Sequence, residues 1–343
     1  MQTHANILFV QTQGAYLRKN HETVQVQVEG AVKLTVPLHH LEGIVCFGRV
    51  SLSPGMMEVC EERNMPIAMM TEQGRLNARI VPAQCGNVLL RREQYRRADD
   101  PAACLKIARA IVAAKIQNCR VLSLRAARET DAAESAEPLR HAAVRLACSL
   151  DTLARAETMD SVRGCEGDAA RCYFEVFDQM IRQQRDSFRF TTRSRRPPLD
   201  RINALLSFVY SVLTHDMASA LEAVGLDPAV GFLHTDRPGR LSLALDLLEE
   251  FRPLIADRLV LSLLNRRQVT PDGFETQPGG AVLMDEKIRK TLLTALTQRK
   301  KETVTHPLLG EQLTIGLLPH IQARLLARHL RGDIDQYPAL VLK

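Results

Sequence analysis

Short apolar runs in the first eighty residues predict strands. Residues 23–28 alternate valine with polar residues, which is the period of a strand with one buried face. Four further apolar runs are bounded by glycine, proline or polar turns, and they cover residues 6–12, 33–36, 43–47 and 66–70. One short helix is predicted over residues 54–63, because Pro54 follows Ser53. We therefore predict a small β-rich domain over residues 1–85.

The apolar period becomes helical after Pro82. Arginines crowd residues 86–100, which we interpret as a basic linker. Pro101, with Asp99 or Asp100 as an N-cap, begins an alanine-rich helix that runs to about residue 130. Further helices are predicted over residues 138–158, 167–182, 200–224, 242–265, 286–299 and 311–331. The fold class is then α+β, with a larger all-α domain over residues 101–343.

Two segments interrupt the helical pattern. Residues 183–196 are polar and rich in arginine, which predicts a mobile loop. Residues 267–284 contain Pro-Asp-Gly and Gly-Gly, which predict a β-hairpin or a loop.

Composition narrows the class of protein. The net charge of +6 favours polyanionic partners, and the absence of tryptophan argues against a carbohydrate binder. The eight cysteines, Cys85 among them, form no C-x-x-C pair, so the common zinc-site spacings are absent. We find no secretory signal and no apolar run that approaches bilayer length. These features predict a reduced cytoplasmic protein with buried structural thiols.

The segment from Gly231 to Pro253 carries candidate chemistry. His234 lies in a polar, turn-like stretch, and Glu249 lies on a leucine-rich helical run with Asp246 three residues before it, on the same face. One imidazole with carboxylates suits a divalent cation such as Mn²⁺ or Mg²⁺. A structural histidine and an ion-paired Asp246 remain the alternative. Glu250 is expected to be solvated.

Glu166 is a candidate for the other half of the site. Gly164 and Gly167 flank it just before a helical run, so a ligand can approach closely. If Glu166 lies at the N-terminus of that helix, the helix dipole favours the ionised form of its carboxylate. The alternative is a first-turn acid that interacts only with the helix dipole.

Basic residues lie around these candidates. Arg193, Arg195 and Arg196 occupy a proline-stiffened loop, which suits contact with phosphate but also describes a solvated linker. Arg237 and Arg240 follow His234. Asp200 is a predicted N-cap for the next helix, where the spacing of Phe208 and Tyr210 is typical of core residues.

Four motifs in this part of the chain resemble one known family. They are Arg163-Gly-Cys-Glu-Gly with Tyr173-Phe174, Arg195-Arg-Pro-Pro with the helix that follows, Gly231-Phe-Leu-His, and Leu245-Asp-Leu-Leu-Glu with Phe251-Arg-Pro. In this order they resemble the CRISPR-associated protein one family of spacer-acquisition integrases. Stretches near Gly14, Leu41 and Gly86 are similar to the branch found with type I-C systems.

The resemblance implies specific roles. Glu166, His234 and Glu249 would be the ligands of Mg²⁺ or Mn²⁺, with Asp246 as a second-shell or alternate ligand. Tyr210 would lie near the substrate. The family likeness also implies a homodimer built through the β-rich domains, and two such dimers bridged by a dimer of CRISPR-associated protein two.

The implied reaction joins foreign double-stranded DNA fragments to a CRISPR repeat, or hydrolyses DNA with water as the nucleophile. The basic segments would hold duplex backbone with little sequence preference. Two alternatives are an inactive DNA-binding scaffold and a metal-dependent phosphohydrolase of small phosphorylated metabolites. The ordered motifs favour the integrase.

Overall fold

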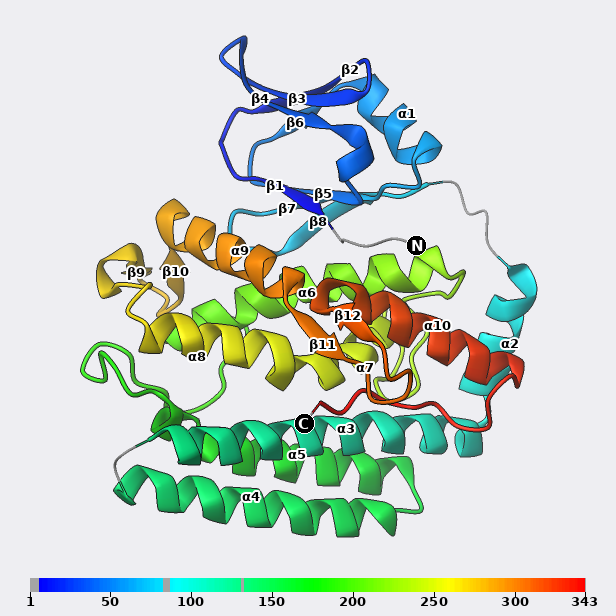
Figure 1. Cartoon of the computed structure of the whole chain (residues 1–343), viewed down its shortest axis with the longest axis vertical. Coiled ribbons are helices and arrows are strands. Elements are labelled where there is room, and N and C mark those ends of the chain that lie inside the picture. The colour runs from blue at the N-terminus through cyan, green and yellow to red at the C-terminus, as the bar shows by residue number, and fades with distance from the viewer. Residues whose placement is uncertain (1–5, 83–86, 131–132, 343) are drawn as a thin grey trace.

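The chain folds into a β-rich region that lies above a larger helical region (Figure 1). The structure is a computed structural model that describes residues 6–82, 87–130 and 133–342. The predicted fold class, β-rich and then helical, is confirmed. The boundary predicted between residues 85 and 86, and Cys85 itself, lie outside the described residues.

One sheet of the β-rich region faces the helices. Its order is β1-β5-β7-β8, with the first three strands parallel and the last antiparallel. Strand β5, which lies between β1 and β7, is buried at all five positions, as expected for a strand covered on both faces. The strands are β1 (Ile7–Val10), β5 (Gly43–Phe47), β7 (Ile67–Met70) and β8 (Leu76–Ile80).

The second sheet has the order β4-β3-β2-β6. Leu17, Val24 and Val26 point from it into a core shared with Met56 and Val59 of helix α1 (Pro54–Glu62). The alternating valines are confirmed as the inward face of a strand. The strands are β2 (Tyr16–Asn20), β3 (Thr23–Val28), β4 (Ala31–Pro37) and β6 (Ser51–Leu52).

The helical region contains most of the remaining chain. Helices α3, α4 and α5 pack together at the bottom of Figure 1, and α6 crosses between them and the first sheet. The helices are α2 (Val88–Ala98), α3 (Pro101–Glu129), α4 (Ala133–Ala154), α5 (Met159–Glu175), α6 (Arg201–Ala223), α7 (Ser242–Phe251), α8 (Arg258–Asn265), α9 (Glu286–Lys301) and α10 (Leu318–Arg331).

Two small hairpins complete the fold. β9 (Phe274–Thr276) pairs with β10 (Val282–Met284), which confirms the hairpin predicted over residues 267–284. β11 (Thr303–Thr305) pairs with β12 (Gln312–Thr314), and this second hairpin occupies the start of the segment that we predicted as helical from residue 311.

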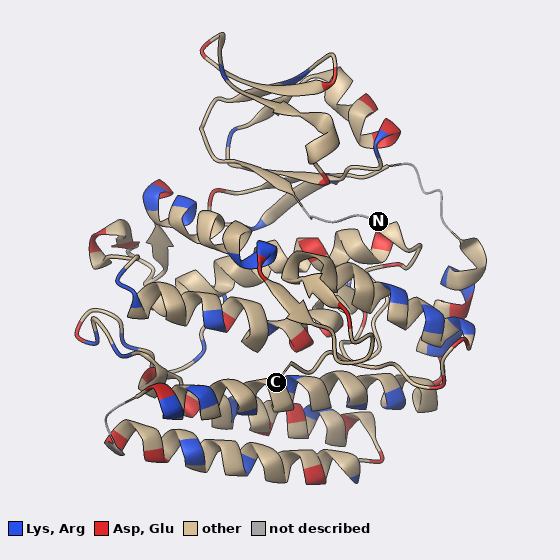
Figure 2. Ribbon diagram, viewed as in Figure 1, with Lys and Arg blue, Asp and Glu red and all other residues tan. Residues whose placement is uncertain are grey.

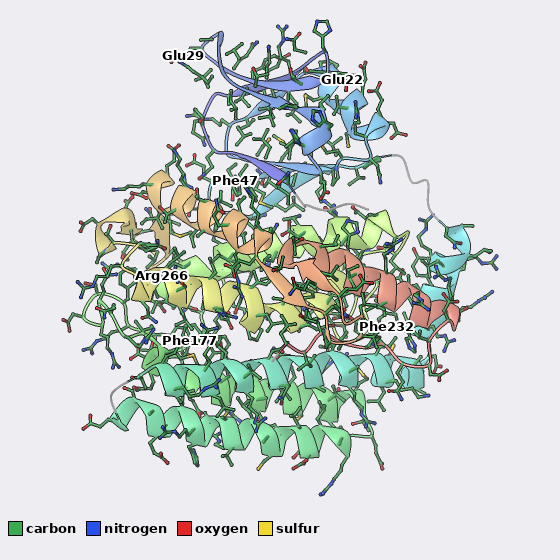
Figure 3. The ribbon with its side chains drawn as sticks, in the orientation of Figure 1. Glu22, Glu29, Phe47, Phe177, Phe232 and Arg266 are labelled. Atoms are coloured by element: carbon green, nitrogen blue, oxygen red, sulfur yellow. The ribbon has the colours of Figure 1, made fainter. Side chains whose placement is uncertain are left out.

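Aromatic stacking joins the two regions. The rings of Phe47 and Phe208 are stacked with centroids 5.5 Å apart, and Figure 3 shows Phe47 where the β-rich region meets the helices. Arg79 of β8 also donates to Glu222 of α6, with Nη2 and Oε2 2.6 Å apart. The core of the helical region therefore continues into the first sheet, which fixes how the β-rich region is held against α6.

Helix α6 corrects one expectation from the sequence. It is long and apolar enough to cross a membrane by length and composition, although no such run was expected. Most of its apolar window is buried inside the protein, however, as in the core helix of a soluble protein.

The segment predicted as one helix over residues 242–265 is divided. Helix α7 ends at Phe251, a π-helical turn follows over Arg252–Asp257, and α8 begins at Arg258. Pro253 has no N–H to donate, so the regular helical ladder is interrupted at this point. Arg252 and Asp257 are the first and last residues of this turn, and their contacts are described with the candidate site below.

Candidate functional site

Helix α7 brings three acidic residues into the interior. Asp246, Glu249 and Glu250 are at most 2% exposed, on a helix whose other residues from Ser242 to Phe251 are nearly all buried too. Buried carboxylates are costly unless they are paired. Each of the three therefore has a defined set of partners, and these partners separate their roles.

Asp246 organises the loop that ends in His234. Its Oδ2 accepts hydrogen bonds from the backbone N–H groups of Phe232 and Leu233 at 2.6 and 2.9 Å. Its Oδ1 accepts the N–H of His234 at 2.9 Å. Gly231 allows this approach, because a Cβ there would lie 2.8 Å from Asp246 Oδ2. Phe232, which is labelled in Figure 3, marks the position of this loop.

The same carboxylate orients the imidazole of His234. Nδ1 of His234 lies 2.7 Å from Oδ1 of Asp246, which leaves Nε2 for a different partner. The side chain of His234 is 22% exposed, so that nitrogen is accessible. Arg163 of α5 fixes the loop from the other side, since its guanidinium donates to the carbonyl of Leu233 at 3.1 Å.

Glu166 corrects the sequence prediction. It lies inside α5, which begins at Met159 with Thr158 as its N-cap, and not at a helix N-terminus. The flanking glycines are part of the helix, and a Cβ at Gly164 or Gly167 would meet nothing within 4 Å. The expected close approach for a ligand is therefore available, but the favourable helix dipole is not.

Lys115 of α3 joins the two halves of the site, and sequence reasoning missed it. Its Nζ forms an ion pair with Glu166 and another with Glu249 Oε2, the latter at 2.6 Å. Two glutamates that are distant in the sequence are thus brought to one point. The available signal was a single lysine in the apolar run Ile111-Val-Ala-Ala-Lys-Ile, at a position where the helix is buried.

Arg252 completes a buried charge cluster. Its Nη1 lies 2.9 Å from Oε1 of Glu249. Burial acts to raise the pKa of Glu249, but Arg252 and Lys115 outweigh it and hold that pKa well below its usual range. Glu249 is therefore ionised at neutral pH, as a metal ligand or an ion-pair partner must be.

Glu250 is not solvated, contrary to the sequence expectation. Its Oε1 accepts the hydroxyl of Tyr337 at 2.7 Å, and Oε2 accepts the N–H of Leu340 at 2.6 Å and the amide of Gln322 at 3.1 Å. Asn118 of α3 also donates to the Leu340 carbonyl. Glu250 therefore fastens residues 337–340 to α7, and burial raises its pKa to about 7.

Tyr210 is in the core and also next to the site. It is 9% exposed, and its ring lies 4.9 Å from the guanidinium carbon of Arg252 and 5.3 Å from that of Arg193. Its hydroxyl donates to Asp257. Tyr210 therefore contacts the charge cluster through Arg252, and the arginine-rich loop through Arg193.

The predicted basic residues divide into two groups. Arg193 is engaged internally, since it donates to Asn203 Oδ1 at 2.7 Å and to Ser207 at 3.0 Å. Arg195, Arg196 and Arg237 are exposed. Arg240 is half-buried, and its pKa is lowered by burial and then by the nearby charges of Arg237, Arg195 and Arg196. Figure 2 shows the distribution of charge over the helices.

The loop over residues 183–196 is anchored at several points. Phe188 and Phe190 are buried in the main core. Asn203 of α6 accepts the N–H of Ser194 and donates to the Thr192 carbonyl. Asp200 caps α6, as predicted, by accepting the N–H of Asn203 at 2.7 Å.

Glu166, Glu249 and His234 are arranged around Lys115 and Asp246. Among the residues that the structure describes, no group of three or more His, Cys, Asp or Glu side chains lies close enough to hold a metal ion as it stands. The two carboxylates nevertheless share a single cationic partner, Lys115.

The sequence of this chain is similar to those of known proteins. Residues 8–298 match the family model of CRISPR associated protein Cas1. A CRISPR-associated endonuclease Cas1 of Chlorobaculum tepidum is 51% identical over 99% of both chains. A second one, from Moorella thermoacetica, is 48% identical over 97% of both chains.

Solved structures share the fold. A casposase bound to integration product superposes with a TM-score of 0.83 at 20% identity, covering 98% of this chain and 94% of that one. A Cas6-RT-Cas1–Cas2 complex contains a chain with a TM-score of 0.82 at 20% identity, which covers 100% of this chain and 36% of that one.

Proposed function

The chain belongs to the CRISPR-associated Cas1 family and is an endonuclease and integrase of spacer acquisition, and we propose that Glu166, His234 and Glu249 form its catalytic metal site. One observation supports the site above the others. Carboxylates from α5 and α7 meet at a single cationic nitrogen, beside an imidazole that Asp246 holds in a fixed orientation.

The residues present fit a divalent cation. Two carboxylates and one imidazole nitrogen are a donor set that Mg²⁺ or Mn²⁺ accepts. Glu249 is held in its ionised form, and the hydrogen bond from Nδ1 of His234 directs Nε2 away from Asp246. When bound, such a cation supplies charge for the phosphate oxygens and for the leaving oxygen.

The surrounding residues have positioning roles. Asp246 holds His234, and Arg252 holds Glu249 while it lies against Tyr210. In integration, the 3′-hydroxyl of the foreign fragment gives up its proton, and its oxygen forms a new bond to a phosphorus atom of the repeat as the old P–O bond breaks. The departing oxygen takes up a proton.

Exposed arginines would hold the substrate. Arg195, Arg196, Arg237 and Arg240 cluster on one surface, where arginine forks bind phosphate oxygens without reading sequence. Arg193 and Tyr210 support this surface from beneath. Double-stranded DNA, both the foreign fragment and the CRISPR repeat, is therefore the proposed substrate.

The proposed assembly follows the family. The Cas1–Cas2 neighbour supports a dimer of CRISPR-associated protein two as the partner. For this chain we place a homodimer contact on the β-rich domain, residues 1–85, and the catalytic domain over residues 101–343. The segment between them, predicted as a basic linker over 86–100, contains helix α2, which Asn87 caps. Val32 and Leu34 are 49% and 47% exposed on edge strand β4, which offers an apolar contact. The compartment proposed is the cytoplasm.

The test uses two variants of the ligands and one matched control. His234→Ala and Glu249→Gln should lose both Mn²⁺ binding, followed by electron paramagnetic resonance, and transfer of a labelled fragment into a repeat duplex. His141→Ala, at an exposed histidine on α4, should retain both. Circular dichroism checks the fold. Normal metal binding and strand transfer in both ligand variants would refute the proposed site.

A further inference from the structure

Lys115 is nearly buried at the centre of the charge cluster. Its side chain is 8% exposed, and it comes from α3, whereas its two partners come from α5 and α7. Burial acts to lower its pKa, and Glu249 and Glu166 together outweigh that effect. Lys115 is therefore a charged ammonium group enclosed by the two carboxylates.

The geometry makes Lys115 a competitor for the carboxylate oxygens. Oε1 of Glu249 is already engaged by Arg252 at 2.9 Å, so Oε2 is the oxygen that remains, and Lys115 Nζ lies 2.6 Å from it. An ion at a metal–oxygen distance of roughly 2.0–2.4 Å from Oε2 would lie against that ammonium. Both cations cannot share this oxygen without strong repulsion at short range.

The count of charges leads to the same conclusion. Lys115 and Arg252 carry two positive charges, and Glu166 and Glu249 carry two negative charges, so the charges of these four ion-paired side chains already cancel. A divalent cation that entered with Lys115 in place would leave these four side chains with an excess of two positive charges in a largely buried site. Displacement of the flexible lysine side chain removes part of that excess.

We propose that Lys115 is a resident cation of the metal-free enzyme, which stabilises the carboxylate pair and is displaced when the divalent cation binds. It is a positioning residue that lowers the affinity for the metal. The inference rests on the proposed metal site and adds to it: entry of the cation and departure of the ammonium group are one exchange. DNA phosphate beside the metal offers the displaced ammonium a new partner.

The experiment measures Mn²⁺ binding to the full-length protein without DNA. Lys115→Met removes the charge and retains much of the side-chain volume. We expect its Kd for Mn²⁺ to fall by about tenfold or more by isothermal titration calorimetry, because no ion pair has to be broken. Lys106→Met removes a charge from an exposed position on the same helix and should leave the Kd unchanged.

Thermal unfolding provides a second readout. Metal-free Lys115→Met should unfold at a lower temperature than wild type, because Glu166 and Oε2 of Glu249 lose their ion pair with Lys115. Saturating Mn²⁺ should raise its Tm by more than it raises that of wild type. An equal or weaker affinity for Mn²⁺ in Lys115→Met would overturn the exchange and assign Lys115 a role alongside the metal.

Two further arms keep the outcomes separate. Glu249→Gln tests the site itself: if it and wild type bind Mn²⁺ equally, the proposed metal site fails, whatever Lys115 does. If Lys115→Met does not fold, the wild-type protein is treated with an amine-directed reagent with and without Mg²⁺. Lys115 should then be labelled more with Mg²⁺, whereas labelling of Lys106 stays constant. Equal labelling of Lys115 in the absence of Mg²⁺ and at saturating Mg²⁺ would refute its displacement.

Discussion

The Tyr210 hydroxyl donates a 2.5 Å hydrogen bond to Oδ1 of Asp257, while Tyr173 donates to Oδ2 of the same carboxylate at 2.9 Å. All three groups are buried. Asp257 therefore links α5, α6 and the end of the π-helical turn in a dry environment. Arg252, at the start of that turn, pairs with Glu249. The residues that support the proposed metal site thus include the buried carboxylate of Asp257.

We expect the stability of the protein to depend on the ionisation of Asp257. Burial raises its pKa from 3.8 to about 6, against the two tyrosine hydrogen bonds. The folded state binds the proton of Asp257 more tightly than the unfolded state does. The contribution of this group to the free energy of unfolding is therefore complete below pH 4 and is lost as the pH rises through 6. The loss amounts to about 3 kcal/mol.

Asp257→Asn removes this titration. As the pH rises from 4 to 6.5, the unfolding free energy of wild type should therefore fall relative to that of Asp257→Asn. Urea titrations of both proteins measure this difference. Asp160→Asn, at a side chain that is 96% exposed, is the matched control and should show no such shift. Parallel pH profiles for wild type and Asp257→Asn would contradict the prediction.

Asp246→Asn should destabilise the protein and disable strand transfer. The amide has one acceptor oxygen in place of two, so at least two of the hydrogen bonds to Phe232, Leu233 and His234 are lost. We expect the unfolding free energy to fall by roughly 2–4 kcal/mol. Asp236→Asn is the control, because exposed Asp236 accepts only a 3.3 Å hydrogen bond from Gly231 in the same loop. Similar unfolding free energies for the two variants would argue against Asp246 as the organiser of the loop.

Arg195→Gln with Arg196→Gln should reduce the salt dependence of DNA binding. Each lost phosphate contact lowers the slope of log affinity against log salt by about 0.7–0.9, so the pair should lower it by roughly 1.4–1.8 for all duplex sequences. Arg140→Gln on α4 with Arg155→Gln in the turn directly after it, two exposed arginines, should leave the slope unchanged. A loss confined to one DNA sequence would indicate base readout instead.

Val32→Lys with Leu34→Lys should dissociate the proposed homodimer. Charges on the exposed edge strand β4 oppose apolar pairing between two copies. Light scattering after gel filtration should then report half of the wild-type molecular mass. Val144→Lys, at a side chain of α4 that is 62% exposed, should retain the dimer. A wild-type protein that is itself monomeric would refute the contact at once.

The fold class can be predicted from the sequence because apolar residues recur at regular spacings within single strands and helices of this chain. Alternating valines mark β3, and Pro101 with Asp100 marks the start of α3. β2 was missed, since Leu17 is the single apolar residue near its centre that turns fully inward. The start of α5 was missed because Gly164 and Gly167 resemble a break, whereas in the fold they leave open space beside Glu166.

The partners of the site residues were not predictable. Glu166, His234, Asp246 and Glu249 carry recognisable motifs, but Lys115 is defined only by carboxylates that α5 and α7 bring to it. Glu250 was expected to face water, because its partners Gln322, Tyr337 and Leu340 come 72 to 90 residues later. Spacing along one helix gives no information about contacts that the tertiary fold supplies.

The bond between Glu250 and Leu340 sets an order of events during synthesis. Leu340 is translated 90 residues after Glu250. At 5–20 residues per second, a nascent chain carries the acidic residues of α7 for roughly 5–18 s before the segment that fastens this helix exists. The proposed site therefore reaches its final form only after residues 337–340 have been made, and fragments released before that point would lack the contacts that hold Glu250, next to Glu249 on α7.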